Sequence, residues 1–167
     1  MTETDKSPIE QALEEWLPDN DIGVMAHGFL PHGRDYFFVI EDCLGPRPGT
    51  HRLVFTHVVD LRYVTRVTDD AWRDAWTDEF TDYQEWLDAG EPEGYVWGSN
   101  WSNAYPGVTT HAISLNAAQW TKRLGKPMHE MAIETDRFLI ELVFHDLRVE
   151  KLSDTAPTVS QVTIPLP

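Results

Sequence analysis

The stretch FLIELVFHDLRV, residues 138–149, decides how this chain folds. Apolar residues alternate along its first half, which is typical of a strand with one buried face. Leu147 and Val149 then have the opposite parity, so the alternation changes phase near residues 145–146. A β-bulge at that point would keep one continuous apolar face. We therefore predict a strand over 138–149 with a bulge near its middle.

Further strands are predicted on the N-terminal side of this stretch, and most of them group into hairpins. Turn residues such as Pro31-His32-Gly33-Arg34 separate runs of β-branched and aromatic residues. The alternation over residues 53–67 fits one long strand or two strands with a bend. The segment Leu53-Val54-Phe55-Thr56-His57 weakly echoes Leu142-Val143-Phe144-His145-Asp146, and coincidence between two amphipathic strands is the simpler explanation. The predicted strands are residues 24–30, 35–43, 53–67, 108–115, 128–135 and 138–149.

Three helices are predicted between the strands from their capping residues and apolar stripes. In the second, aromatic residues recur at helical spacing from Trp72 to Trp86, and Gly90 ends the helix. The third is capped by Asn116 and closed by Gly125. The predicted helices are residues 8–17, 70–89 and 116–124.

Hairpins of strands with helices inserted between them indicate an α+β domain. We expect a mainly antiparallel sheet with about three helices packed on it, and a two-sheet β-sandwich with inserted helices is the alternative. A regular β-α-β alternation is missing, which argues against a doubly wound parallel fold. The length of 167 residues fits a single globular domain, residues 1–152, followed by a loosely ordered tail, residues 153–167.

The charge of the chain is strongly negative and unevenly distributed. The net charge is −15, and the segment 69–93 carries −9 of it, from ten acidic residues and Arg73. A negative net charge argues against nucleic acid or an anionic membrane as a partner. No apolar run approaches the roughly 20 residues of a membrane-spanning helix, and the N-terminus lacks the pattern of a signal peptide. Since Cys43 is the only cysteine, no internal disulfide can form, and we expect a cytoplasmic protein.

One candidate site lies at the first predicted hairpin, where histidines stand beside an arginine and an aspartate. A small-molecule site or a hydrolase there would need these side chains to converge, together with two residues from another strand. No nucleophile motif and no zinc-ligand spacing accompanies them, so neither a metal nor a cofactor is expected. Histidines that only hydrogen-bond locally are the simpler interpretation. The candidate residues are His27, His32, Arg34, Asp35, His145 and Asp146.

A second candidate surface combines acidic and aromatic residues. The acids of the predicted helix 70–89 would attract a basic partner and speed its association, whereas a solvated helix face is the simpler interpretation. The aromatic residues of the stretch 95–107 would anchor a partner, or would bind a sugar or planar ligand through Trp97 and Trp101, whereas packing in the core is the simpler interpretation. The candidate partner-binding residues are Asp74, Asp78, Asp82, Glu85, Trp97, Trp101 and Tyr105.

Five short motifs occur together between residues 21 and 152. They are Ala26-His27-Gly28-Phe29, His32-x-Arg34-Asp35-Tyr36, Trp97-Gly98, Tyr105-Pro106-Gly107 and Phe144-His145-Asp146-Leu147. In this combination the chain resembles the YxiG-like bacterial proteins. The namesake of that family belongs to a group of small genes near a polymorphic contact-dependent toxin. The resemblance therefore implies an immunity-like or toxin-associated role, and it carries over no catalytic residue.

These observations favour a non-enzymatic module that binds a protein. Many toxin effector domains are basic nucleases, and an acidic surface would complement one. We therefore predict an immunity-like, toxin-associated module with a basic protein as its partner. The alternative is a small-molecule-binding domain or hydrolase with a His/Asp site at the first hairpin.

Overall fold

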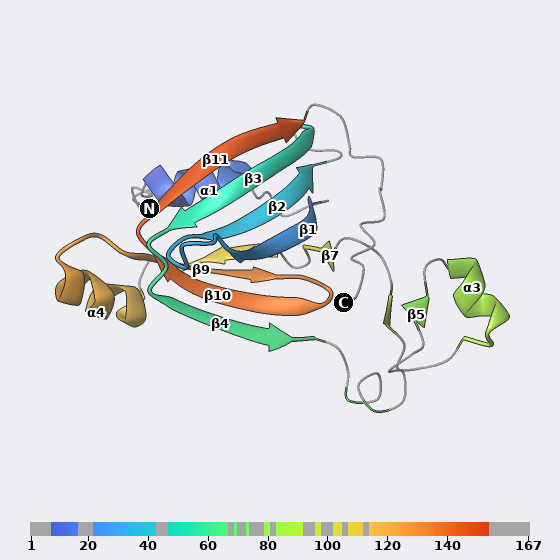
Figure 1. The fold of residues 1–167 in the computed structure, drawn as a ribbon. Coiled ribbons are helices and arrows are strands. Elements are labelled where there is room, and N and C mark those ends of the chain that lie inside the picture. Colours follow the sequence, from blue (N-terminus) through green and yellow to red (C-terminus); the bar gives the residue numbers. More distant parts are fainter. Residues whose placement is uncertain are drawn as a thin grey trace, which may run out of the picture.

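Two antiparallel sheets enclose the core of the protein in this computed structural model (Figure 1). Sheet A contains β1 (Ile22–Phe29), β2 (Tyr36–Asp42), β3 (Gly49–Thr56), β7 (Ser102–Asn103) and β11 (Asp146–Ser153), in the order β11-β3-β2-β1-β7. Sheet B contains β4 (Asp60–Thr65), β8 (Gly107–Thr110), β9 (His129–Glu134) and β10 (Phe138–Phe144), in the order β4-β10-β9-β8. The structure describes residues 8–16, 22–42, 47–66, 69, 73, 79–80, 83–91, 96–97, 102–104, 107–111 and 114–153.

The predicted α+β class is confirmed. Both predicted hairpins form, since β1 pairs with β2 and β9 pairs with β10, each time antiparallel. Gly33 has a φ of 69° in the first turn, a conformation that glycine adopts without steric cost. Three helices accompany the sheets in the described part of the chain: α1 (Pro8–Trp16), α3 (Tyr83–Asp88) and α4 (Leu115–Leu124).

Each of the two long predicted strands changes sheet in mid-course. Residues 53–67 form β3 in sheet A and β4 in sheet B, which agrees with the prediction of two strands with a bend. Residues 138–149 form β10 in sheet B and then β11 in sheet A, with His145 between them. The predicted bulge is therefore wrong. The alternation changes phase because the chain passes from one sheet to the other. Residues of the opposite parity then face the core.

The two bent strands run antiparallel to one another through the corner that joins the sheets. In sheet A β3 pairs with β11, and in sheet B β4 pairs with β10. The backbone N–H of His145 donates to the carbonyl of Thr56 at 2.9 Å, and that of Val59 donates to Val143 at 2.9 Å. These bonds hold the corner on both sides of the change of sheet, which lies at the left of Figure 1.

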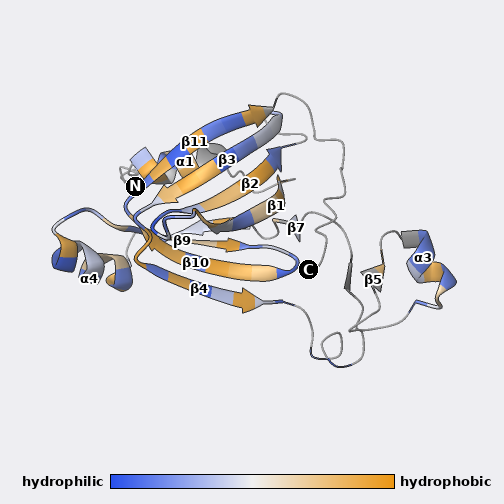
Figure 2. Ribbon diagram, in the orientation of Figure 1, coloured by the Kyte–Doolittle hydropathy of each residue, from blue (hydrophilic) through white to orange (hydrophobic). Residues whose placement is uncertain are grey.

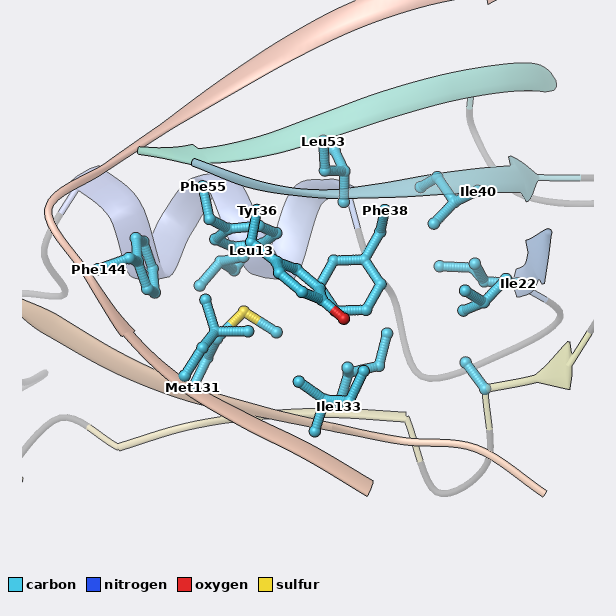
Figure 3. Packing of buried hydrophobic residues seen from close by; sticks show 14 of the residues in the cluster. Leu13, Ile22, Tyr36, Phe38, Ile40, Leu53, Phe55, Met131, Ile133 and Phe144 are labelled. Atoms are coloured by element: carbon cyan, nitrogen blue, oxygen red, sulfur yellow. The ribbon is translucent and has the colours of Figure 1, made fainter. Parts of the chain in front are cut away.

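The core lies between the two sheets and is rich in aromatic side chains (Figure 3). Phe38 and Phe55 come from sheet A, Met131 and Phe144 come from sheet B, and Leu13 comes from α1. Full burial of one side chain of this size stabilises the folded protein by about 1.5–3 kcal/mol. Figure 2 shows the matching sequence pattern, since β10 is apolar over most of its length and β11 alternates.

The α4 helix covers part of the outer face of sheet B. Its buried Ala117 and half-buried Trp120 pack on Met128 and Val143. Gly125 closes the helix with a φ of 66°, as predicted. The predicted cap, however, is wrong, because the side chain that accepts a hydrogen bond from the free backbone N–H of Ala117 is Ser114, at 2.9 Å.

A single helix over residues 70–89 is also not formed. Glu79 and Phe80 form strand β5, which pairs in parallel with β6 (Val96–Trp97). Phe80 is buried, so pairing and burial outweigh the helical spacing of the aromatic residues. In the described part of this stretch Arg73 is helical and α3 spans Tyr83–Asp88, and Gly90 follows α3 with a φ of 87°, as predicted.

Some predictions fall on residues that the structure does not describe. The tail is one, since β11 extends to Ser153 and residues 154–167 lie outside the described part. Cys43 also lies outside it. Among the described residues, no helix is both long enough and apolar enough to cross a bilayer.

Candidate functional site

The turn of the first hairpin holds a buried carboxylate, Asp35, with only 2% of its surface exposed. Arg34 donates to it twice, from Nε at 2.9 Å and from Nη2 at 3.3 Å. The backbone N–H of His57 donates to the same carboxylate at 3.0 Å, and His32 Nε2 lies 3.6 Å from it. Three of the residues predicted from the sequence, His32, Arg34 and Asp35, are therefore brought together.

The environment of Asp35 strongly favours its charged form. The hydrogen bond from Arg34 is the main cause that lowers the pKa of Asp35 to about 2, although burial opposes it, and the amide of His57 lowers it further. His57 has a φ of 51°, which is uncommon for a residue other than glycine. Because Asp35 binds the amide of this residue, it ties the hairpin turn to the point where the chain leaves sheet A. A carboxylate of such low pKa is a poor general base.

His145 contacts the ring of His57, whose backbone binds Asp35, whereas Asp146 makes no such contact. The rings of His57 and His145 lie edge to face with centroids 5.8 Å apart. His145 Nδ1 donates to the carbonyl oxygen of Pro127 at 2.7 Å. Asp146 accepts a hydrogen bond from the backbone N–H of Leu147 at 2.9 Å. The side chains of both predicted residues are thus engaged locally and do not bond to the buried carboxylate.

His27 lies apart from that group, in an aromatic cluster between β1 and β4. Its Nδ1 shares a hydrogen bond of 2.7 Å with the hydroxyl of Tyr36. Its ring centroid lies 4.6 Å from that of Phe138 and 6.0 Å from that of Tyr63. Tyr63 and Phe29, which packs edge to face on Tyr36, are each about half exposed. The cluster therefore reaches from the core to the surface on the side of the molecule where β1 and β4 lie (Figure 1).

Burial holds the two polar members of this cluster in their neutral forms. It lowers the pKa of His27, and it raises the pKa of Tyr36 to about 12, with the nearby Tyr63 as a second cause. At neutral pH the pair is therefore an imidazole and a phenol joined by a hydrogen bond. Such a pair can orient a ligand, but a phenol of this pKa is a poor nucleophile.

A hollow of about 170 Å³ lies between the start of α4 and the outer face of sheet B. Three carboxylates and one arginine line it, so its side chains carry a net charge of −2. Asn116 donates to Asp60 at 2.9 Å, Arg62 donates to Glu141 at 3.0 Å, and Ser114 donates to Glu130. The polar residues that line the hollow are Asp60, Arg62, Asn116, Glu130 and Glu141.

The described residues do not assemble a catalytic centre of a common kind. No group of three or more histidine, cysteine, aspartate or glutamate side chains among them could hold a metal ion. In the same part of the chain, no serine, threonine or cysteine side chain hydrogen-bonds to the ring of His32, His57 or His145. At the first hairpin, Asp35 instead joins the turn to the point where the chain leaves sheet A.

Of the predicted partner-binding residues, the structure describes the side chain of one. Glu85 lies exposed on α3. Trp97 belongs to β6, but its side chain lies outside the described part. The remaining five, Asp74, Asp78, Asp82, Trp101 and Tyr105, also lie outside it.

Several residues of these sites were missed in the sequence. In residues 138–149 the apolar alternation changes phase at His145, where the chain passes between the sheets. His57 lies at the corresponding change of sheet in residues 53–67. Tyr36 directly follows the predicted Asp35, but its partner His27 is fixed only by strand pairing. The carboxylates of the hollow come from three strands and have no spacing along the chain that would reveal them.

Comparison with known proteins gives a family and one structure. A family model described as "YxiG-like protein" matches residues 5–161. No curated protein matches the chain. Among solved structures, the chain is similar to the "Crystal structure of an uncharacterized protein from Neisseria gonorrhoeae", with 11% identity over 78% of this chain and 91% of that chain. The TM-score of 0.38 is too low to carry an argument about function.

Proposed function

The chain belongs to the YxiG-like protein family, and from this premise we propose that it is a non-enzymatic module that binds a basic protein. An immunity-like protein that covers a basic toxin domain would be such a module. The observation that carries the proposal is the concentration of negative charge. The segment 69–93 contributes −9 to a net charge of −15, although it spans only a small part of the chain.

The described part of this segment supports the proposal. Glu85, Asp88 and Glu91 are exposed on α3 and the turn that follows it. Figure 1 shows α3 beyond the two sheets, at the opposite end of the molecule from α4. A surface of one sign in this position raises the rate of association with a partner of opposite sign by about 10- to 1,000-fold. This electrostatic attraction also selects partners by their charge.

The geometry of the first hairpin gives less support to an enzyme. Asp35 is bound by Arg34 and by the amide of His57, and its low pKa makes it a weak base. His27, which a hydrolase there would also use, bonds to Tyr36 instead. These contacts account for the residues without any reaction.

The experiment starts with the tagged protein purified from its native host, followed by mass spectrometry of what accompanies it. The captured protein is then purified and its association rate is measured by stopped flow at several salt concentrations. Reversal of Asp74, Asp78, Asp82 and Glu85 to lysine should lower the association rate at least about tenfold, with a smaller dependence on salt. An unchanged rate would show that the acidic segment does not steer the partner.

A matched control separates this local effect from net charge. The double variant Asp78→Lys with Glu85→Lys is compared with Asp136→Lys with Asp146→Lys, because Asp136 and Asp146 are exposed acids elsewhere. Both variants change the net charge equally. The first should slow association much more than the second. Equal slowing would mean that only the total charge of the molecule matters.

A second function, binding of a small amine or guanidinium group, is favoured by the acidic hollow beside α4. Its volume of about 170 Å³ admits a small group only, and its net charge of −2 favours a cation. Titration with spermidine, followed by NMR, should shift the amide signals of β4, β9 and β10. The variant Glu130→Gln should weaken that binding, and shifts spread evenly over the acidic surface would contradict a defined site.

A further inference from the structure

The end of α4 carries a group of cations in an otherwise acidic protein. Lys122, Arg123 and Lys126 are all exposed. No aspartate or glutamate occurs from residue 94 to residue 129, so this stretch contributes +3 to a chain of net charge −15. Lysine and arginine at the C-terminal end of a helix are also favoured by the helix dipole, which explains their position but not their exposure as a group.

These three cations differ in their contacts from five arginines of the described residues. They form no ion pair there, although the chain has 28 acidic residues for 13 basic ones. Among these three side chains, the Arg123 guanidinium makes a cation–π contact, since it lies 3.9 Å from the ring centroid of Trp120. By contrast, Arg34, Arg52, Arg62, Arg66 and Arg148 all pair with carboxylates.

The same helix also exposes apolar side chains. Leu115 is 79% exposed and Leu124 is 47% exposed, the latter directly beside Arg123. Leu124 therefore lies exposed among the unpaired cations at the end of α4, where a partner would bury the leucine and pair the charges.

A complementary surface is present on the chain itself. Glu85, Asp88 and Glu91 are exposed at α3, and their charge of −3 matches the +3 of α4. In Figure 1 α3 and α4 lie at opposite ends of the molecule, with the two sheets between them. The two surfaces therefore do not meet within one molecule, but each can meet the other in a neighbouring copy.

We propose that the basic end of α4 docks on the acidic surface of α3 in a second copy of this chain, so that copies associate head to tail. This contact rests on the proposed function, because both require the acidic surface at α3 to bind a cationic surface. The contact is heterologous, which means that it repeats from copy to copy unless it closes into a ring. Its charges are exposed, so the association is weak and falls steeply with salt.

The test uses two variants of the full chain, each with one surface reversed. Variant one carries Lys122→Glu, Arg123→Glu and Lys126→Glu, and variant two carries Glu85→Lys, Asp88→Lys and Glu91→Lys. Circular dichroism and thermal unfolding show first that both fold as the unmodified protein does. Sedimentation velocity at low salt then measures the size of each protein over a range of concentrations.

The unmodified protein should grow in size with concentration at low salt and return to monomer at high salt. Each variant alone should remain monomeric, because its two surfaces now have the same sign. A mixture of the two should associate with the variants in equal proportion, since the basic end of α4 in variant two docks on the acidic α3 of variant one and the two reversed surfaces match in the same way. A chain with all six substitutions should associate again.

A monomeric unmodified protein at every concentration, or a mixture that forms no complex, would overturn the inference. These outcomes are separate from the test of the proposed function. If variant two loses a captured basic protein while no copy binds another, the inference fails and the proposed function stands. If the mixture forms its complex while no basic protein is captured from the host, the head-to-tail contact stands by itself.

Discussion

The rings of Phe55 and Phe144 meet edge to face in the core, with centroids 4.8 Å apart and both side chains fully buried. Each phenylalanine stands just before the point where its strand changes sheet. They are also the equivalent residues of the two short sequence segments that echo one another, residues 53–57 and 142–146. The echo in sequence thus corresponds to a contact across the corner that joins the sheets.

This contact predicts an energetic coupling. Phe55→Leu and Phe144→Leu should each lower the free energy of unfolding by about 1–3 kcal/mol. The double variant should lose less than the sum of the two, by about 0.5–1.5 kcal/mol, because an edge-to-face pair contributes that much beyond its buried area. Urea unfolding of all four proteins measures the coupling. Strict additivity would show that the two rings act independently.

Asp35 should make the protein sensitive to acid. Its pKa is lowered in the fold, so the ionised group stabilises the protein above its ordinary pKa of 3.8, and this stability is lost as the pH falls towards about 2. The shift corresponds to about 2 kcal/mol. Asp35→Asn should lower the free energy of unfolding by about that amount at pH 7 and should flatten its fall below pH 4. Asp146→Asn, at an exposed position, serves as the control for the loss of a carboxylate and should cost less than about 0.5 kcal/mol at pH 7.

The hydroxyl of Tyr36 should stabilise the fold through its bond to His27. Tyr36→Phe should lower the free energy of unfolding by about 1 kcal/mol, since it removes one partly buried hydrogen bond and keeps the ring. Tyr63→Phe is the matched control, because its ring lies in the same cluster and its hydroxyl has no hydrogen-bond partner among the described residues. The control should change stability by less than about 0.5 kcal/mol. Equal losses in the two variants would argue against a role for the bond.

The lowered pKa of His27 predicts a second dependence on pH. Burial disfavours the imidazolium in the fold, so the unfolded chain takes up a proton first as the pH falls below 6.5. The stability of the protein should therefore fall from pH 7.5 to pH 5.5. His27→Gln should reduce this slope, and His111→Gln, at an exposed position, is the control for the loss of a histidine. Chemical denaturation at several pH values gives the slopes, and identical slopes for both variants would rule out His27 as the cause.

Ser114 rather than Asn116 should cap α4. Ser114→Ala should cost about 1 kcal/mol, because it leaves the N–H of Ala117 without its acceptor and also removes the bond to Glu130. Asn116→Ala removes only a surface bond to Asp60 and should cost less than about 0.5 kcal/mol. Thermal unfolding of both variants ranks them. The opposite ranking would restore the cap predicted from the sequence.

Much of the fold could be predicted because its signals are local. Alternation of apolar residues identified the strands, and the turn at residues 31–34 identified the first hairpin. Gly125 identified the end of α4, because glycine alone adopts the left-handed conformation there without cost. The strand β5 was missed, since its two residues depend on a partner more than ten residues away in the chain.

The candidate site was predicted only in part, for a related reason. His32, Arg34 and Asp35 are neighbours in the sequence, so a turn sufficed to bring them together. His27 found Tyr36 through strand pairing, and the carboxylates of the hollow met only when β4, β9 and β10 paired. No spacing along the chain encodes such contacts.

The sequence by itself determined the class of the protein, the elements at its centre and the sign and position of its charge, because these follow from side-chain types and local periodicity. Only the tertiary structure decided that the change of phase near His145 is a passage between two sheets. A bulge and a change of sheet produce the same alternation in one strand. The difference lies in which partner supplies the backbone hydrogen bonds, and for β11 that partner is β3, about ninety residues earlier in the chain.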